Sequence, residues 1–313
     1  MPNFENPGTD VSGFYITSKK LVLTVLDRSA PYSILGTGQS FFDFELNLST
    51  HKPLQILEQV QKTFNDLKIS MNLDVRGCNF AISPTSFKTL VLPYHSLLDK
   101  EELYSQYLWE ISMLNPGINP NGITVNFDEI PSSFLYNYPI AYIYFIENKL
   151  SEIIKVFAGN NNIKLNKMLP AHRSFDLVKF FGTSHGTGII LSLFYSQKTL
   201  SINIFSDSNL IFNSCWYNIN IENIPVIIEK SIFLQHSGLL KRDVFKGAVF
   251  FADELSPNTA TSLEKKIGIR IINSEIPLIS SYIDSNKLDD SQNQTNFFLP
   301  ALGAALSELY YET

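Results

Sequence analysis

Residues 13–26 read GFYITSKKLVLTVL, and their spacing decides the fold. Phe14 and Ile16 are two residues apart, the polar group Ser18-Lys19-Lys20 follows, and the apolar alternation resumes over Leu21–Leu26. Successive side chains of a strand point to opposite faces, so a period of two indicates a strand. The stretch therefore predicts a strand, a tight turn and a second strand.

The same layout returns in the second half of the chain. Apolar residues fill 189–194, a polar turn follows at 195–198, and the alternation resumes at Leu200, Ile202 and Ile204. Further strands are predicted after each hairpin, at 32–36, at 38–46 with Phe42 and Phe44 on one face, and at 210–215. Each half then continues into alternating helices and strands, which predicts two similar α/β lobes.

Apolar residues at three- and four-residue spacing predict helices over 54–67, 99–114, 148–157, 224–237 and 256–267. Residues 74–83 and 87–92 are predicted as two strands around a turn at Pro84. Further strands are expected at 123–130, 140–146, 248–251 and 270–272.

The composition excludes several classes of protein. The 313 residues carry 24 Lys+Arg and 30 Asp+Glu, so the formal balance of −6 argues against a nucleic-acid binder, which needs a basic surface. A hydrophobic content of 44% with 17% charged residues is typical of an ordered globular protein. No secretory signal or apolar run of about 18 residues is visible, so we expect a cytoplasmic protein without a membrane-inserted segment.

Other candidate sites are weak. Cys78 and Cys215 are expected to be free buried thiols, and the four histidines outside 182–188 have no partners at metal-ligand spacing, so no metal site is predicted. The glycines at 182, 186 and 188 precede a strand rather than a helix, which favours a hinge over a phosphate loop and makes His185 a solvated loop residue. No nucleophile with an identifiable base is apparent, so no catalytic residue is predicted.

Three segments, taken in order, resemble the PilM family of type IV pilus assembly proteins, which have relatives in type II secretion. They are the stretch beginning at Gly13, the segment Thr89–Pro93 with Asp99–Leu103 and Trp109-Glu110 downstream, and the C-terminal FFLPALGAAL at 297–306. The resemblance implies an actin-like ATPase fold, also described as the ASKHA or duplicated RNase H-like fold, in a bacterial inner-membrane assembly platform.

Actin-like proteins hold a nucleotide between two lobes, and each lobe supplies a phosphate hairpin with an Asp and a close-approach Gly. The resemblance places Tyr15 and Thr17 at these two positions of the first hairpin, and Ser192 and Phe194 at those of the second. On the adenosine side, Phe251, Ala252 and Asp253 precede the helix that Pro257 opens. These departures predict a pseudo-ATPase with no cofactor and no enzymatic activity.

The aromatic residues suggest a binding surface instead. Tyr104, Tyr107 and Trp109 on the second predicted helix, with Phe42 and Phe44, could line an apolar groove for an extended peptide or a partner helix. A structural role in the core remains the alternative for each of them.

The expected organisation is a polar leader at 1–11, an actin-like lobe one at 12–180 with a small inserted α+β subdomain at about 74–135, and a lobe two at 181–313. The resemblance implies that the last helix, 300–309, returns to lobe one. It also implies a scaffold that binds the cytoplasmic peptide of a membrane-anchored PilN-like protein and so associates peripherally with the inner membrane. A homodimer, a divergent ATP-binding ATPase and an unrelated regulatory pseudo-ATPase adaptor remain open.

Overall fold

The computed structural model describes residues 10–27, 33–47, 51–72, 75–180, 188–207, 209–253, 258–272 and 296–310. The chain forms two compact units. Unit 1 comprises the described residues within 1–83, 152–183 and 274–313, and unit 2 those within 84–151 and 184–273. Most of the predicted leader and the glycine-rich stretch 181–187 with His185 lie outside the described residues.

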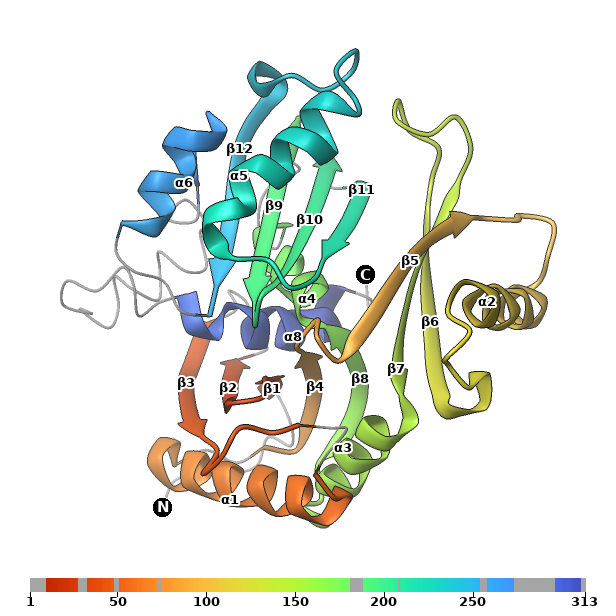
Figure 1. The fold of residues 1–313 in the computed structure, drawn as a ribbon. Helices are drawn as coiled ribbons and strands as arrows, with labels where there is room; N and C mark the ends of the chain where they lie inside the picture. Colours follow the sequence, from red (N-terminus) through yellow and green to blue (C-terminus); the bar gives the residue numbers. More distant parts are fainter. Residues whose placement is uncertain are drawn as a thin grey trace. The chain divides into compact units, whose positions relative to one another are not determined.

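Unit 1 is built on a five-stranded sheet with the order β3-β2-β1-β4-β8 (Figure 1). β1 pairs antiparallel with β2 and parallel with β4, so the hairpin predicted at 13–26 forms the middle of the sheet. The strands are β1 (Asp10–Ile16), β2 (Lys20–Asp27), β3 (Ser33–Phe41), β4 (Gly77–Ile82) and β8 (Lys164–Pro170).

Helices cover both faces of this sheet. On one face, α1 (Pro53–Met71) and α3 (Asn148–Asn160) pack through phenylalanines, with Phe14 of β1 stacked on Phe80 at 4.7 Å and Phe64 of α1 edge-on to Phe157 of α3 at 5.3 Å. On the other face, α8 (Leu299–Tyr310) lies against β1 and packs on α4 (Ala171–Phe180). A Cβ placed on Gly13 would lie 1.9 Å from the carbonyl oxygen of Ala301. The alternation of Gly13 and Phe14 thus sets a close helix contact on one face and an aromatic core on the other.

Unit 2 contains a four-stranded sheet with the order β11-β10-β9-β12. Its strands are β9 (Ile189–Ser196), β10 (Thr199–Ser206), β11 (Asn209–Trp216) and β12 (Phe245–Ala252). β9 pairs antiparallel with β10 and parallel with β12, as β1 pairs with β2 and β4 in unit 1. A single parallel bridge between Ala248 and Ile271 stands where β8 stands in unit 1.

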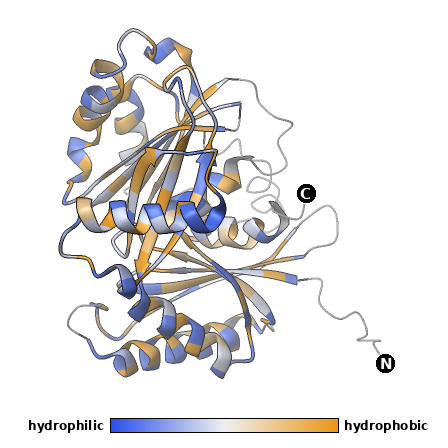
Figure 2. Ribbon diagram, turned by 90° about the vertical axis from the view of Figure 1, so that its right-hand side faces the viewer, coloured by the Kyte–Doolittle hydropathy of each residue, from blue (hydrophilic) through white to orange (hydrophobic). Residues whose placement is uncertain are grey.

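The helices beside this sheet are shorter than predicted. α5 (Ile224–Ile228) continues as a π-helical stretch over Glu229–Leu234, and α6 is Thr259–Ile267. Short 3₁₀ turns lie at Pro120–Gly122, Ile221–Asn223, Arg242–Val244 and, in unit 1, Asn296–Phe298. Figure 2 shows apolar residues concentrated along the strands, while the helices carry both apolar and polar residues.

The remaining part of unit 2 is a three-stranded antiparallel sheet, β5-β7-β6, with α2 (Lys100–Leu114) against one face. The strands are β5 (Phe87–Pro93), β6 (Ile123–Ile130) and β7 (Ile140–Glu147). α2 begins at Asp99, whose side chain accepts the backbone N–H groups of Glu101 and Glu102. Leu103, Tyr107 and Ile111 form its buried stripe.

Two expectations about the strands need correction. The strands predicted around Pro84 do not form a hairpin, because β4 belongs to the five-stranded sheet and β5 to the three-stranded one. The inserted sheet thus begins after β4 and includes β7, whereas about 74–135 was expected. β4 is buried along almost its whole length, which is typical of a parallel strand with both faces covered.

The strands expected at 32–36 and 38–46 are one strand, β3, which ends at Phe41.

No helix among the described residues is long and apolar enough to span a membrane.

Candidate functional site

The turn between β1 and β2 is closed by Thr17. Its backbone N–H donates to the carbonyl oxygen of Lys20 at 3.0 Å. Its hydroxyl oxygen accepts the backbone N–H groups of Lys19 and Lys20, each at 3.0 Å, and the side chain is 7% exposed. The turn amides are therefore bonded to the chain itself, a common role of a threonine hydroxyl in a turn.

A segment of the same unit lies across this turn. The backbone N–H groups of Phe42 and Leu46 donate to the carbonyl oxygens of Lys19 and Ser18, at 2.9 and 2.6 Å. The Ser18 hydroxyl donates to the Glu45 carboxylate at 2.7 Å. A carboxylate beside the turn disfavours a phosphate there, because like charges repel.

The second hairpin is closed by a two-residue turn. Ser196 pairs with Thr199, and the turn residues Gln197 and Lys198 have φ of 50° and 61°, the left-handed conformation of a type I′ turn. Hydrogen bonds from other segments of the chain also stabilise this turn. Thr85 Oγ1 donates to Gln197 Oε1 at 2.9 Å, and the Ile219 N–H donates to the Lys198 carbonyl oxygen at 2.8 Å.

Asp253 stands beside the second hairpin. The hydroxyl of Ser196, a fully buried residue, donates to the Asp253 carboxylate, and the Asp253 N–H donates to the Tyr195 carbonyl oxygen at 3.3 Å. In unit 1 the Ser83 N–H donates to the Ile16 carbonyl oxygen at 3.0 Å in the same way. Asp253 is thus the counterpart of Ser83, and it bonds the end of β12 to the hairpin.

The registers correct the counterparts expected in the second hairpin. The Thr17–Lys20 and Ser196–Thr199 pairs close equivalent turns, so Ser196 corresponds to Thr17 and Phe194 to Tyr15. The expected pair, Ser192 and Phe194, lies two residues too early. The sequence count assumed a four-residue turn, whereas the strand continues to Ser196 and the turn has two residues.

The other residues expected to replace nucleotide-binding positions are interior. Tyr15, Ser192, Phe194, Phe251 and Ala252 are all buried. Phe194 and Phe251 stack with ring centroids 4.5 Å apart and planes at 11°. Their aromatic pair forms part of the packing of neighbouring parallel strands β9 and β12. Pro257 lies outside the described residues.

The aromatic residues expected to bind a partner separate into two groups. Trp109 is 62% exposed and Tyr104 is 37% exposed on α2, and Phe44 is 40% exposed. Tyr107 is fully buried beside Phe127, with ring centroids 5.1 Å apart, and Phe42 is buried where its segment crosses the first hairpin. Tyr107 and Phe42 are therefore core residues. Burial also raises the pKa of the Tyr107 hydroxyl to about 12.

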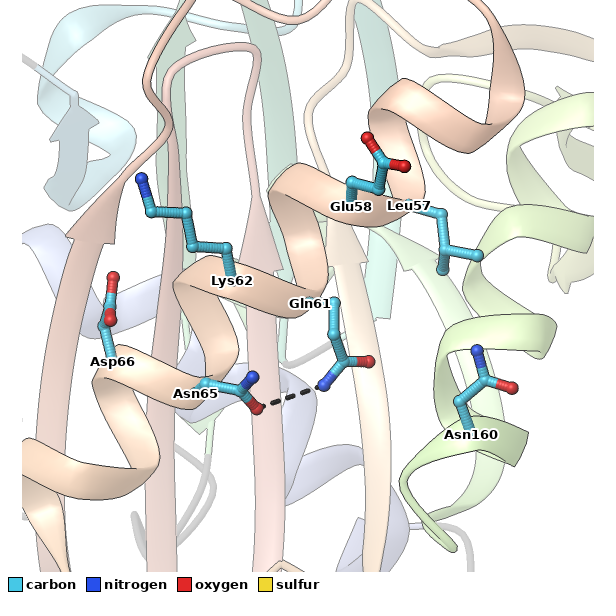
Figure 3. A pocket seen from close by; sticks show the side chains of 7 residues that line it. All are labelled: Leu57, Glu58, Gln61, Lys62, Asn65, Asp66 and Asn160. Carbon is cyan, nitrogen blue, oxygen red and sulfur yellow. Dashed lines mark hydrogen bonds between the residues drawn. The ribbon is translucent and has the colours of Figure 1, made fainter.

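A groove of about 530 Å³, lined mostly by polar and charged residues, lies on unit 1 between α1 and α3 (Figure 3). Gln61, one of the lining residues, exchanges two hydrogen bonds with Asn161, which directly follows α3, at 2.8 and 2.7 Å, and also donates to Asn65 at 3.1 Å. Lys62 pairs with Asp43 at 2.6 Å, and this bond lowers the pKa of the Asp43 carboxyl. No sequence pattern predicted this groove, because most of its residues form the polar face of the amphipathic helix α1.

The titratable groups in the described part of the chain form no metal centre. Among the described residues, no group of three or more His, Cys, Asp and Glu side chains is placed to hold a metal ion. Cys78 and Cys215 are free thiols; Cys78 is buried, which raises its pKa, whereas Cys215 is half-buried rather than buried as expected. His172 is fully buried, and desolvation, with a smaller contribution from the charge of Arg173, lowers its pKa to about 3.

Comparison with known proteins gives matches in structure alone. No family model and no curated protein matches the sequence. A solved structure of the "PilM-PilN type IV pilus biogenesis complex" is similar with a TM-score of 0.67 and 10% identity, over 95% of this chain and 98% of that one. A Bacteroides thetaiotaomicron protein "with actin-like ATPase fold and unknown function" is similar with a TM-score of 0.53 and 12% identity, over 92% and 98%.

The ethanolamine utilization protein EutJ from Carboxydothermus hydrogenoformans is similar with a TM-score of 0.50 and 8% identity, over 96% of this chain and 90% of that one. At these identities the likenesses concern the fold. The chain has the two-lobed actin-like ATPase fold, as the resemblance of its sequence implied.

Proposed function

We propose that this chain is a non-catalytic scaffold of a type IV pilus or related secretion platform, which binds the cytoplasmic segment of a membrane protein. The similarity to a PilM–PilN complex extends over nearly the whole of both chains and supports this context. Through such a partner the protein would be held at the inner membrane without inserting into it.

The closure of the first hairpin is the observation that supports the proposed lack of catalysis. The amides of Lys19 and Lys20 are bonded to the Thr17 hydroxyl, and Glu45 stands beside the turn. A phosphate would have to replace two satisfied hydrogen bonds and approach a carboxylate. Both changes cost free energy, with no gain from a close-approach glycine.

Titration calorimetry and thermal-shift measurements with Mg²⁺ and ATP test this part. We expect no heat of binding and no change in melting temperature at millimolar nucleotide, because ligand binding to the native state would stabilise it. Saturable binding at micromolar ATP would contradict the proposal and favour a divergent ATPase.

The partner is tested with the cytoplasmic peptide of a PilN-like membrane protein from the same genome. We expect micromolar binding that falls about tenfold in Trp109→Ala, since exposed tryptophans are common binding hot spots. Tyr217→Ala is the matched control, because Tyr217 is 47% exposed and lies elsewhere in unit 2. Absence of binding to the wild-type chain would refute the proposed partner, and equal loss in both variants would refute the site on α2.

A further inference from the structure

The segment 234–244, which follows the π-helical stretch of unit 2, exposes large apolar side chains. Leu234 is 63% exposed, Leu239 is 52% exposed, and Val244 is exposed as well. The turn between the two leucines is closed by the His236 carbonyl oxygen, which accepts the backbone N–H groups of Leu239 and Leu240, each at 2.8 Å. Single exposed apolar residues are common on protein surfaces, whereas several in one short segment indicate a contact surface.

Arg242 fixes this segment against two helices. Its Nε donates to the carbonyl oxygen of Ile267, the last residue of α6, at 3.0 Å, and its guanidinium lies 4.5 Å from the centre of the Phe233 ring. It also pairs with Glu229 at the start of the π-helical stretch. The segment therefore lies beside the C-terminal end of α6, and Figure 1 shows both at the end of the four-stranded sheet where β12 begins.

Lysines surround the exposed leucines. Lys230 is exposed on the π-helical stretch, Lys241 in the segment 234–244, and Lys265 and Lys266 in the last turn of α6. Residues 224–246 and 259–272 together carry seven Lys and Arg against three Asp and Glu, a formal balance of +4 in a chain whose balance is −6. The positive charge is therefore concentrated at this end of unit 2, next to apolar side chains.

We infer that this surface, formed by residues 230–244 and the last turn of α6, binds the face of an anionic lipid bilayer. Leucines beside lysines suit such a contact, because the apolar side chains enter the boundary between headgroups and acyl chains while the lysines face anionic headgroups. A nucleic acid would engage the lysines but leave the leucines in water. The contact is peripheral, since only side chains enter the interface. It goes beyond the proposed function, because it needs no protein partner.

Cosedimentation of the intact chain with lipid vesicles tests the inference with no membrane protein present. We expect binding to phosphatidylcholine vesicles that contain about 30% phosphatidylglycerol, and much weaker binding to pure phosphatidylcholine. Binding should fall as NaCl rises from about 0.1 to about 0.5 M, because salt screens the lysines. No binding, or equal binding to both kinds of vesicle, would overturn the inference. Binding to polyglutamate without binding to vesicles would overturn it in favour of an acidic protein partner.

Charge reversal tests the lysines. Lys230→Glu/Lys241→Glu should weaken binding to the anionic vesicles at least about 25-fold, because each lysine near such a surface contributes a factor of about five. Lys88→Glu/Lys100→Glu is the matched control, since these lysines are exposed on β5 and α2 and the net charge changes equally. The control should keep most of the binding. Equal weakening in both would show that net charge alone decides, and would overturn the assignment to this surface.

A second pair of variants tests the leucines. Leu234→Ser/Leu239→Ser should weaken vesicle binding about tenfold, because the apolar side chains no longer gain from leaving water. Leu54→Ser/Ile69→Ser is the control, since these apolar side chains of α1 are also highly exposed, and it should bind as the wild type does. Circular dichroism and melting temperatures establish that each variant is folded. Unchanged binding of Leu234→Ser/Leu239→Ser would overturn the inferred contact of the leucines with lipid.

Discussion

At the first hairpin a single hydroxyl closes the turn. Thr17→Val keeps the shape of the side chain and removes the acceptor of the Lys19 and Lys20 amides. We expect the free energy of unfolding to fall by about 1 to 2 kcal/mol, since the lost bonds are partly shielded from water. Urea denaturation measures this, and Thr17→Ser, which keeps the hydroxyl, should lose much less. Equal losses in both variants would show that the methyl group matters rather than the hydroxyl.

His172 makes stability depend on pH. Its pKa is about 3 in the folded chain because burial disfavours the charged form, and about 6.5 in the unfolded chain. Between these values the unfolded chain binds the proton and the folded chain does not, so stability falls as the pH falls from about 6.5 to about 3.

From pH 8 to pH 5 this group should cost about 2 kcal/mol. His172→Gln cannot take up the proton, so the difference in unfolding free energy between pH 8 and pH 5 should shrink by that amount. Urea denaturation at both pH values makes the comparison. An unchanged pH dependence would mean that another group is responsible.

The residues of the candidate site were only partly predictable from the sequence. The spacing around Ser18-Lys19-Lys20 located Tyr15 and Thr17 on the first hairpin. The positions predicted in the second hairpin were displaced by two residues, because the predicted polar turn of four residues included two that continue β9, and the turn itself is only Gln197 and Lys198. Tyr107 is buried because it belongs to the buried stripe of α2, and its aromatic side chain alone did not indicate this.

At the scale of the elements, small residues let α8 pack closely against α4. A Cβ on Gly303 would lie 1.6 Å from the carbonyl oxygen of Ser174 in α4, so the helix backbones touch there. Gly303→Ala must push α8 off α4 and should destabilise the protein by about 3 kcal/mol, at the upper end of overpacking costs. A loss below about 1 kcal/mol would show that the helix moves freely.

Gly159→Ala in α3 is the matched control. Nothing lies within 4 Å of a Cβ at that position, and alanine favours a helix over glycine. We expect no loss and a gain of up to about 1 kcal/mol. Thermal and urea denaturation of both variants gives the comparison.

The elements show where sequence patterns stop being informative. Alternation predicted β1, β2, β9 and β10 well, because the two strands of each hairpin pair with each other. It did not predict the partner of β4, since a period of two specifies which faces are covered but not which strand lies alongside. A short polar turn at Pro84 looked like a hairpin, whereas β4 and β5 belong to different sheets.

At the scale of the whole molecule, the chain contains the same strand order twice, with an inserted sheet. β2-β1-β4 in unit 1 corresponds to β10-β9-β12 in unit 2. The residue that directly follows the parallel strand donates to the hairpin in both units, Ser83 after β4 and Asp253 after β12. The alternation of apolar residues in the strands maintains the fold, whereas the residues of the turns can differ without changing it.

This organisation predicts which deletions the protein tolerates. Removing residues 74–135 takes away β4, which pairs with both β1 and β8, so the sheet of unit 1 cannot form and the chain should not fold. Phe87 and Ile146 are paired across β5 and β7, so a short glycine-containing turn can replace residues 88–145. That variant should retain a cooperative thermal transition at a lower temperature, because β4 stays in place. Circular dichroism and calorimetry compare the two deletions, and a folded 74–135 deletion would show that β4 is dispensable.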